Sequence, residues 1–399
     1  MPVLVHAGFH DFGRGRFDDA GSNLYVNARG EIERIHRTDL DGDGYPDIVV
    51  PNTHGHLERG PTRIFRADGP PGPEVSWSFV DLPHDSGWLS RVADIDGDGY
   101  PDLVVVNGEN GVTSELTSYV YWGGPGGLTG ERTDLSTVGA YDVACVNLAG
   151  HPDGRLDLVM PSAWTDHHNP GRPRPIHVFV QVAPRGFEDQ GASSGPTSVA
   201  GLAIAAGSLR GDGVVDLAIA NLYTEFDLAT DSFVWLGRPG GGFHPAPVRL
   251  PTRAASAVRM ADLDGDGLPE VIFAGGDEVR IYWNRGGRLS AGDVTRLDVP
   301  GFETQFRRGA VGVAVADMDG DGRAELVLAT REGIEIRRPD ALETAALVVP
   351  LRYVATVEAE DLDGDGRPEL LVAVYQDEAT HDVPSRIYWN GPDGFRADR

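Results

Sequence analysis

Apolar residues fall along this chain in short runs that either alternate with polar residues or stand uninterrupted. In residues 311–316 valine alternates with the small residues glycine and alanine, and residues 102–106 form an apolar stretch behind one acidic residue. Aromatic residues join the same pattern in segments 118–122, 232–236, 279–283 and 385–389. A period of two, with Gly, Pro and Asn between the runs, is typical of β-strands joined by turns. No helical periodicity of useful length competes, so the pattern predicts an all-β fold.

An acidic nine-residue pattern, Asp-x-Asp-Gly-Asp-Gly-x-x-Asp/Glu, recurs between the apolar runs and divides the chain into repeats. Intact copies begin at Asp39, Asp94, Asp262, Asp317 and Asp361, and degenerate copies begin at Asn147 and Ser208. The successive starts are separated by 55, 53, 61, 54, 55 and 44 residues. Strand-like segments at a period of about fifty residues are typical of a β-propeller, in which each repeat forms one blade.

Four strand-like segments follow one another within a repeat. They predict a seven-bladed β-propeller of four-stranded antiparallel blades, in one domain spanning residues 1–399, with residues 1–20 as an N-terminal extension packed on the ring. The last repeat stops after its third strand, so segment 22–27 is predicted to complete that blade and close the ring. Closure removes exposed sheet edges. An eight-bladed arrangement, in which 22–27 belongs to a partial blade, is the alternative.

The acidic loops predict bound Ca²⁺, because oxygen ligands at alternate positions with intervening glycines resemble the start of an EF-hand loop. Four clustered carboxylates would repel one another without a cation. We therefore expect five structural calcium sites, using side chains at positions 1, 3, 5 and 9 and the carbonyl at position 7. The residues are Asp39, Asp41, Asp43, Tyr45 and Asp47; Asp94, Asp96, Asp98, Tyr100 and Asp102; Asp262, Asp264, Asp266, Leu268 and Glu270; Asp317, Asp319, Asp321, Arg323 and Glu325; and Asp361, Asp363, Asp365, Arg367 and Glu369.

Two loops depart from the pattern and are predicted not to bind calcium. Arg210 stands at position 3 of the loop that begins at Ser208, where it is expected to replace the ion by pairing with Asp212 or Asp216. The loop that begins at Asn147 has two extra residues and has lost carboxylates.

On these loops the chain resembles the FG-GAP/VCBS repeat family, the calcium-bearing propeller repeats also found in integrin α-subunits. The resemblance covers about residues 20–395. The resemblance implies a β-propeller scaffold with bound calcium. Members of this broad family include adhesion receptors, carbohydrate-binding modules and enzymes acting on sugars, so the activity must come from this chain's own loops.

The face opposite the calcium loops is the expected ligand surface, because the loops between the second and third strands emerge there. Aromatic, amide and acidic residues at this rim suit a sugar, whose faces are apolar and whose hydroxyls need hydrogen-bond partners. Candidate ligand-binding residues are Asn52, Asn107, Glu109, Trp164, Asp166, Asn221 and Tyr223. Arg91 and Arg259 lie on predicted inner strands, where they would either hold a carboxylate or fill the channel as internal Arg–Glu pairs.

Two functions follow, a glycan-binding or protein-binding propeller and, as the alternative, a carbohydrate-active enzyme such as a polysaccharide lyase. A lyase would need a base, an acid and an arginine that neutralises a uronate. Its candidate catalytic residues are His54, His56, His167, His168, Tyr223, Tyr375, Arg91 and Arg259. An additional transition-metal site is a further hypothesis. Its ligands would be His54, His56, Asp166, His167 and His168.

The composition of the chain excludes several classes of binding partner. A formal charge of −27 excludes nucleic acid as a partner, and no apolar run is long enough for a membrane helix. With Cys145 as the only cysteine, an internal disulfide is excluded. We expect a monomer. No export signal is visible, so an extracellular or periplasmic location requires that the signal is absent from this chain, and a cytoplasmic location is the alternative.

Overall fold

The computed structural model describes residues 39–41, 43, 47–50, 53–54, 58–59, 61–67, 69, 77–85, 87–110, 112–163, 173–191, 195–222, 228–299, 312–330, 332–352, 354–361, 366–374, 386–391 and 394–395. Regular secondary structure in these ranges consists of β-strands, without a helical element. The predicted all-β class is confirmed. Segment 22–27, which was predicted to close the ring, lies outside the described residues.

Antiparallel strands form seven sheets of three or four strands in the described part of the chain. In chain order these sheets are β1 (Ile48–Val50), β4 (Thr62–Ala67) and β5 (Trp77–Leu82); β6 (Gly87–Ala93), β7 (Asp102–Asn107), β8 (Glu115–Tyr121) and β9 (Arg132–Val138); β10 (Ala144–Val146), β11 (Asp157–Met160), β13 (His177–Ala183) and β14 (Gly186–Asp189); β16 (Gly201–Gly207), β17 (Asp216–Asn221), β18 (Ala229–Trp235) and β19 (Val248–Arg253); β20 (Ala255–Ala261), β21 (Glu270–Gly275), β22 (Glu278–Tyr282) and β23 (Val294–Asp298); β24 (Val313–Ala316), β25 (Glu325–Ala329), β26 (Gly333–Arg337) and β27 (Leu347–Pro350); and β28 (Val354–Glu360), β29 (Glu369–Val374) and β30 (Arg386–Tyr388).

Three short pairs accompany these sheets. They are β2 (Thr53–His54) with β3 (Glu58–Arg59), β12 (Arg174–Pro175) with β15 (Thr197–Ser198), and β31 (Asn390–Gly391) with β32 (Gly394–Phe395).

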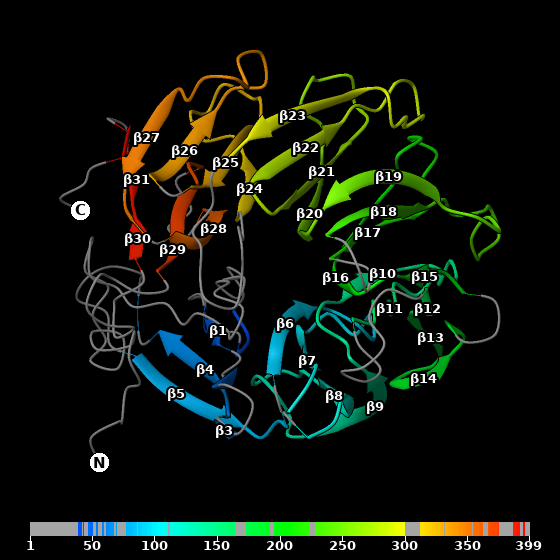
Figure 1. Cartoon of the computed structure of the whole chain (residues 1–399). Coiled ribbons are helices and arrows are strands. Elements are labelled where there is room, and N and C mark those ends of the chain that lie inside the picture. The colour runs from blue at the N-terminus through cyan, green and yellow to red at the C-terminus, as the bar shows by residue number, and fades with distance from the viewer. Residues whose placement is uncertain are drawn as a thin grey trace.

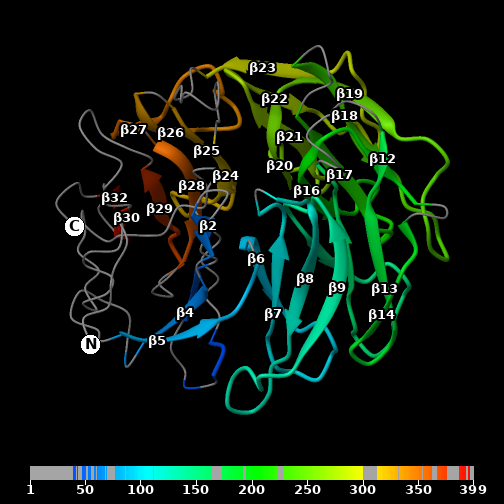
Figure 2. The same ribbon diagram turned by 60° about the horizontal axis from the view of Figure 1, so that its bottom comes forward.

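The sheets follow one another around a common centre in chain order (Figure 1). First strands of successive sheets contact one another, from β10 to β16, β20, β24 and β28. These strands therefore lie innermost, and the later strands of each sheet lie farther out. The view in Figure 2 shows the sheets side by side, with β7, β8 and β9 roughly upright and the outer strands β5 and β23 running across the view. Each sheet is thus arranged as a propeller blade.

The hydrophobic core lies between adjacent sheets. Val104 and Val120 of the second sheet pack with Leu158 and Phe179 of the third in one buried cluster. Equivalent clusters join the other successive pairs, from the first and second sheets to the sixth and seventh. The second strand of a sheet has neighbours on both faces, so every residue of β7, β17 and β21 is buried. This burial explains the uninterrupted apolar runs in the sequence.

Three buried side-chain amides join one sheet to the loop of the sheet before it. Gln181 donates to the carbonyl oxygens of Ile95 and Leu156, at 3.0 Å in both cases. The other two side chains are Asn284, which donates to Leu209 O (2.7 Å) and Pro269 O (3.1 Å), and Asn390, which donates to Met318 O (2.9 Å) and Pro368 O (3.2 Å). Each amide therefore connects position 2 of the preceding acidic loop with position 8 of its own loop. These contacts lock neighbouring sheets in register at that face.

Candidate functional site

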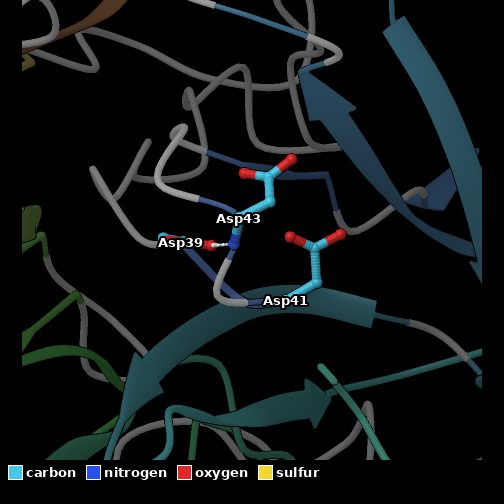
Figure 3. Close-up of side chains that lie close together, drawn as sticks. All are labelled: Asp39, Asp41 and Asp43. Carbon is cyan, nitrogen blue, oxygen red and sulfur yellow. Dashed lines mark hydrogen bonds between the residues drawn. The ribbon is translucent and has the colours of Figure 1, made fainter. Parts of the chain in front are cut away.

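Acidic side chains from the repeated loops converge at four places in the described residues. Their carboxylate oxygens lie within 4.8 Å of one another in each cluster. The clusters are Asp39, Asp41 and Asp43; Asp94, Asp96 and Asp102; Asp262, Asp264 and Glu270; and Asp317, Asp319 and Glu325. Three of them lie where the first strand of a sheet leads to the second, between β6 and β7, β20 and β21, and β24 and β25, and the first cluster precedes β1. Figure 3 shows the first cluster on a single turn, where Asp39 Oδ1 accepts a hydrogen bond from Asp43 N at 3.0 Å.

The glycines of the motif shape this turn. Gly97 and Gly99 have φ angles of 74° and 90°, a region that side chains rarely adopt. The turn points the amide of Gly99 at Asp94 Oδ2, 3.0 Å away. Loops beginning at Asp262, Asp317 and Asp361 repeat this bond between position 6 and position 1 at 2.8, 2.8 and 3.1 Å. The position-1 carboxylate is therefore held in place by the backbone of its own loop.

Position 9 differs from the other carboxylates because it is buried. Asp102 and Glu270 are fully buried, and each accepts a hydrogen bond from the amide of position 2, at 2.8 and 2.7 Å. Asp47 and Glu325 repeat the contact at 2.7 and 2.8 Å. Burial raises the pKa of Asp47 to about 7 and that of Asp102 to about 6, because the charged form loses its water. A bound cation would offset this cost.

Oxygen atoms without a hydrogen bond mark two of the clusters as suited to a cation. Asp41 Oδ1 and Asp94 Oδ1 are buried and accept no hydrogen bond in the described part of the chain. Buried carboxylate oxygens normally have partners. A donor set made only of oxygen matches Ca²⁺, which takes carboxylate and carbonyl ligands. The residues therefore fit the ion that the motif predicts.

Other predicted calcium ligands have different outcomes. The position-5 residues Asp98, Asp266 and Asp321 do not join the clusters, and each accepts the amide of position 7 instead, at 2.9, 2.8 and 2.9 Å. The structure describes Tyr100, Leu268 and Arg323, the position-7 residues of those loops. In the last loop it describes Asp361, Arg367 and Glu369, while Asp363 and Asp365 lie outside the described residues. Tyr45 of the first loop also lies outside them.

Both degenerate loops place a cationic or polar side chain against the position-9 carboxylate. Arg210 Nη2 lies 2.9 Å from Asp216 Oδ1, and Arg210 Nε lies 3.5 Å from Asp212 Oδ2, so the predicted pairing is confirmed. The imidazole of His151 contacts Asp157 Oδ1 at 3.0 Å in the other loop. Replacement of the ion by these side chains stays a prediction.

The opposite ends of the strands carry the predicted ligand face. Asn107 and Asn221 close β7 and β17, and both are fully buried. Their side chains donate to Thr117 O at 2.6 Å and Asp231 O at 2.8 Å. These hydrogen bonds favour a structural role over ligand contact for the two asparagines. The sequence did not distinguish them from exposed loop residues.

Both candidate arginines have acidic partners. Arg91 Nη2 lies 3.0 Å from Asp142 Oδ1, and Arg259 Nη2 lies 2.5 Å from Glu358 Oε1. The second pair connects inner strands β20 and β28, which belong to sheets separated by one other sheet. Of the two interpretations of these arginines, the structure supports internal pairs.

Glu109 belongs to a buried cluster that the sequence did not indicate. Tyr141 donates to Glu109 Oε2 at 3.2 Å, and Trp88 packs edge-on against Tyr141 with ring centroids 4.6 Å apart. Trp88 also donates to Glu109 O at 3.3 Å. Because Trp88 lies on β6, Glu109 follows β7, and Tyr141 lies in the connection from the second sheet to the third, only the fold brings them together. Nothing in the motif spacing could have found them.

Most remaining candidates lie outside the described residues. They are Asn52, His56, Trp164, Asp166, His167, His168, Tyr223 and Tyr375; His54 belongs to β2, but its side chain is not described.

No helix in the described ranges combines the length and apolar character needed to cross a membrane.

Comparison with known proteins agrees with the fold and the repeats. Residues 39–105 and 262–328 match the family described as the FG-GAP-like repeat. No curated protein matches the chain significantly in sequence. The crystal structure of BBS1N in complex with ARL6DN is similar over 94% of this chain and 96% of that chain, with 16% sequence identity and a TM-score of 0.57.

Two further solved structures are more distant. The Dos1 propeller covers 87% of this chain and 81% of its own, with 11% identity and a TM-score of 0.49. An Agrocybe aegerita lectin, described as recognising non-reducing terminal N-acetylglucosamine, covers 79% and 78%, with 19% identity and a TM-score of 0.45. At such identities a likeness concerns the fold alone. The chain is a β-propeller that carries FG-GAP-like repeats.

Proposed function

Starting from the FG-GAP-like repeats, we propose that this chain is a calcium-stabilised, seven-bladed β-propeller that binds a carbohydrate or protein ligand on the face opposite its acidic loops. The observation that carries the calcium part is the convergence of carboxylate oxygens at four corresponding loops. The unpartnered buried oxygens of Asp41 and Asp94 support it. Segment 22–27 would complete the last blade and close the ring.

Calcium would act structurally in this proposal. The ion would connect position 1, at the end of a first strand, with position 9, at the start of a second strand. When bound, it neutralises carboxylates that burial and mutual repulsion make costly to keep charged. The fifth intact loop, which begins at Asp361, would hold an ion in the same way.

The ligand face is proposed from the direction of the strands. β7 begins beside the acidic loop and ends at Asn107, so the loop that contains Glu109 lies at the other end of the sheet. Loops in the same position follow β11 and β17, and their sequences contain Trp164, Asp166 and Tyr223. Loops with aromatic and ionisable residues on a rigid scaffold are common binding sites. Planar rings beside acids and amides suit a sugar.

A glycan array and a panel of extracellular-matrix proteins, probed with and without calcium, test this proposal. We expect a ligand whose binding is weakened at least ~10-fold, or about 1.4 kcal/mol, by Trp164→Ala or Tyr223→Ala. Trp283→Phe, beside an acidic loop, is the matched aromatic control and should bind normally. Loss of binding in the control but not in the loop variants would place the ligand on the acidic face and contradict the proposal.

The enzyme alternative requires a separate readout. Formation of unsaturated product from uronate polysaccharides would reveal a lyase. The arginine pairs disfavour it, because Arg91 and Arg259 already neutralise Asp142 and Glu358. A transition metal at the histidine-rich loops would be revealed by metal analysis of the purified protein.

A further inference from the structure

Arginines from outside the motif contact the position-3 aspartate in four intact loops. In the first loop Arg66 Nη1, on strand β4, lies 3.4 Å from Asp41 Oδ2, and in the other three a closer arginine comes from a loop. Arg185 Nε lies 2.6 Å from Asp96 Oδ2. The corresponding contacts are Arg285 Nη1 to Asp264 Oδ2 at 2.9 Å and Arg338 Nη2 to Asp319 Oδ2 at 2.5 Å. Asp96, Asp264 and Asp319 all occupy position 3. Each of these three arginines lies in the connection between the third and fourth strands of a sheet, so the motif itself does not specify the contact.

The two oxygens of these aspartates have separate partners. While Oδ2 meets the guanidinium, Oδ1 accepts the amide of position 5, at 3.2 Å in the loop of Asp96, 3.3 Å in that of Asp264 and 3.2 Å in that of Asp319. The carboxylate is thus held at both ends. These amide bonds are long, and each Oδ1 has a second lone pair.

Arg210 of the degenerate loop shows what a replacing arginine does instead. Its guanidinium reaches the buried position-9 carboxylate of Asp216 and the carbonyl of Gly237, both at 2.9 Å. Arg185, Arg285 and Arg338 have no such contact with Asp102, Glu270 or Glu325 among the described ion pairs. Their contact with the clustered carboxylates is therefore confined to Oδ2 of the position-3 aspartate.

We propose that Arg185, Arg285 and Arg338 are positioning residues for the calcium loops. Each fixes the position-3 carboxylate by Oδ2 and turns Oδ1 toward the other ligand oxygens. Their positive charge by itself would repel the ion, so it is the fixed orientation of the carboxylate that favours binding. The inference rests on the proposed calcium function and deepens it by naming residues outside the motif that set affinity for the ion.

Arg185 does this across the boundary between two sheets. It lies in the turn between β13 and β14 of the third sheet, while Asp96 belongs to the second. Its φ of 62° is a left-handed conformation that costs a non-glycine residue energy and often accompanies function. Gln181 Oε1 accepts its amide at 3.1 Å, and the Trp122 ring lies 5.0 Å from its guanidinium. Metal binding at Asp94–Asp102 would therefore also strengthen the contact between these sheets.

Terbium luminescence can test the proposal at one loop. Arg285 contacts both Asp264 and the ring of Trp283, 5.3 Å from its guanidinium, so Tb³⁺ in that loop should be sensitised by Trp283. Loss of this emission in Trp283→Phe assigns the signal. Calcium competition then gives the affinity of this loop for calcium.

We expect Arg285→Ala to weaken calcium binding at this loop by about 10-fold, a typical effect of losing a residue that orients a metal ligand. Arg285→Lys keeps the charge but not the planar guanidinium, so its calcium affinity should lie between those of the wild-type protein and Arg285→Ala. Arg249→Ala, which removes an exposed arginine 3.8 Å from Asp231 and away from every acidic loop, is the control. Circular dichroism verifies that all variants are folded.

Unchanged or tighter binding in Arg285→Ala would overturn the inference, since the arginine would then be a bystander or a competitor of the ion. A failure of the calcium function itself is distinct. In that case the wild-type protein would bind neither Tb³⁺ nor Ca²⁺.

Discussion

The carboxylates at different positions of the motif have different environments in the folded chain. Asp94 at position 1 is partly exposed and is held by the backbone of its loop, whereas Asp102 at position 9 is fully buried. Asp102 also accepts the amide of Gly123 at 2.7 Å, from the end of the third strand. Position 9 therefore holds the sheet together as well as belonging to an acidic cluster. This second task explains why Asp157 and Asp216 persist in loops that have lost their acids at positions 1 and 3.

Arg210→Ala should destabilise the protein whether or not calcium is present. The buried carboxylate of Asp216 would lose its guanidinium partner, at a cost of about 1–3 kcal/mol. Denaturant unfolding in calcium and in chelator measures the change. Arg210→Asp is the informative companion, because it restores an acid at position 3. It should be unstable in chelator and recover in calcium, and equal stability in both would argue against an ion-like role for Arg210.

Asp189 gives a prediction for acidic pH. Burial acts to raise its pKa, but the hydrogen bond from His177 Nδ1 at 2.7 Å and backbone amides outweigh it, so the pKa of Asp189 is lowered from 3.8. A lowered folded-state pKa contributes stability above the unfolded value, and this contribution is lost as pH falls through the folded pKa. We therefore expect a stability loss below about pH 4 that is smaller in Asp189→Asn. Thermal melts between pH 2 and pH 6 measure it, and identical acid profiles would contradict the assignment.

At the scale of strands and loops, one residue near the end of the third strand determines how a sheet meets the acidic loop. Its backbone amide donates to the position-9 carboxylate. Gln181, Asn284 and Asn390 occupy this place in three sheets, where their amides reach the preceding loop. Gly123 and Gly237 occupy it in the second and fourth sheets, which alternate with the third, fifth and seventh sheets of the three amides. In both glycine cases a Cβ atom would lie 2.2 Å from the carbonyl oxygen of position 8. The same point in the sheet is therefore filled either by a hydrogen-bonding amide or by glycine.

Gly123→Ala should accordingly destabilise the second sheet. The added methyl group would meet Pro101 O at 2.2 Å, backbone that cannot rotate away, and overpacking of this kind costs about 1–3 kcal/mol. Gly126→Ala is a matched control in the same loop, since nothing lies within 4 Å of its Cβ position. Chemical denaturation of the two variants compares them. Equal stability would show that the loop moves freely enough to absorb the methyl group.

For the whole molecule, stability depends on contacts between sheets. Six of the seven described core clusters contain residues of two successive sheets, and no sheet buries its apolar faces alone. The acidic loops lie between the first and second strands at one end of these sheets, with the amide contacts beside them. Loss of calcium is therefore expected to weaken the assembly as a unit, because neighbouring sheets share the loops' contacts.

Chelation should lower the unfolding temperature, and calcium should restore it. At a free concentration 100 times the dissociation constant, each site that binds only the folded state adds about 2.7 kcal/mol. Differential scanning calorimetry in calcium, magnesium and chelator measures the effect. We expect magnesium to be the weaker stabiliser, because it demands octahedral geometry and gives up water reluctantly. A melting temperature that does not change with calcium would contradict the structural role of the loops.

The sequence by itself determined the elements and the repeats. The alternation of polar and apolar residues is a local consequence of strand geometry, and the spacing of acids and glycines is a local property of one turn. All-β class, loop position and converging acids such as Asp94 and Asp96 were therefore predictable. Tertiary structure decided which side chains meet across sheets. It buried Asn107, and it brought together Arg259 with Glu358 and Arg185 with Asp96. These paired residues lie far apart in the chain, and no local pattern encodes which distant segments meet.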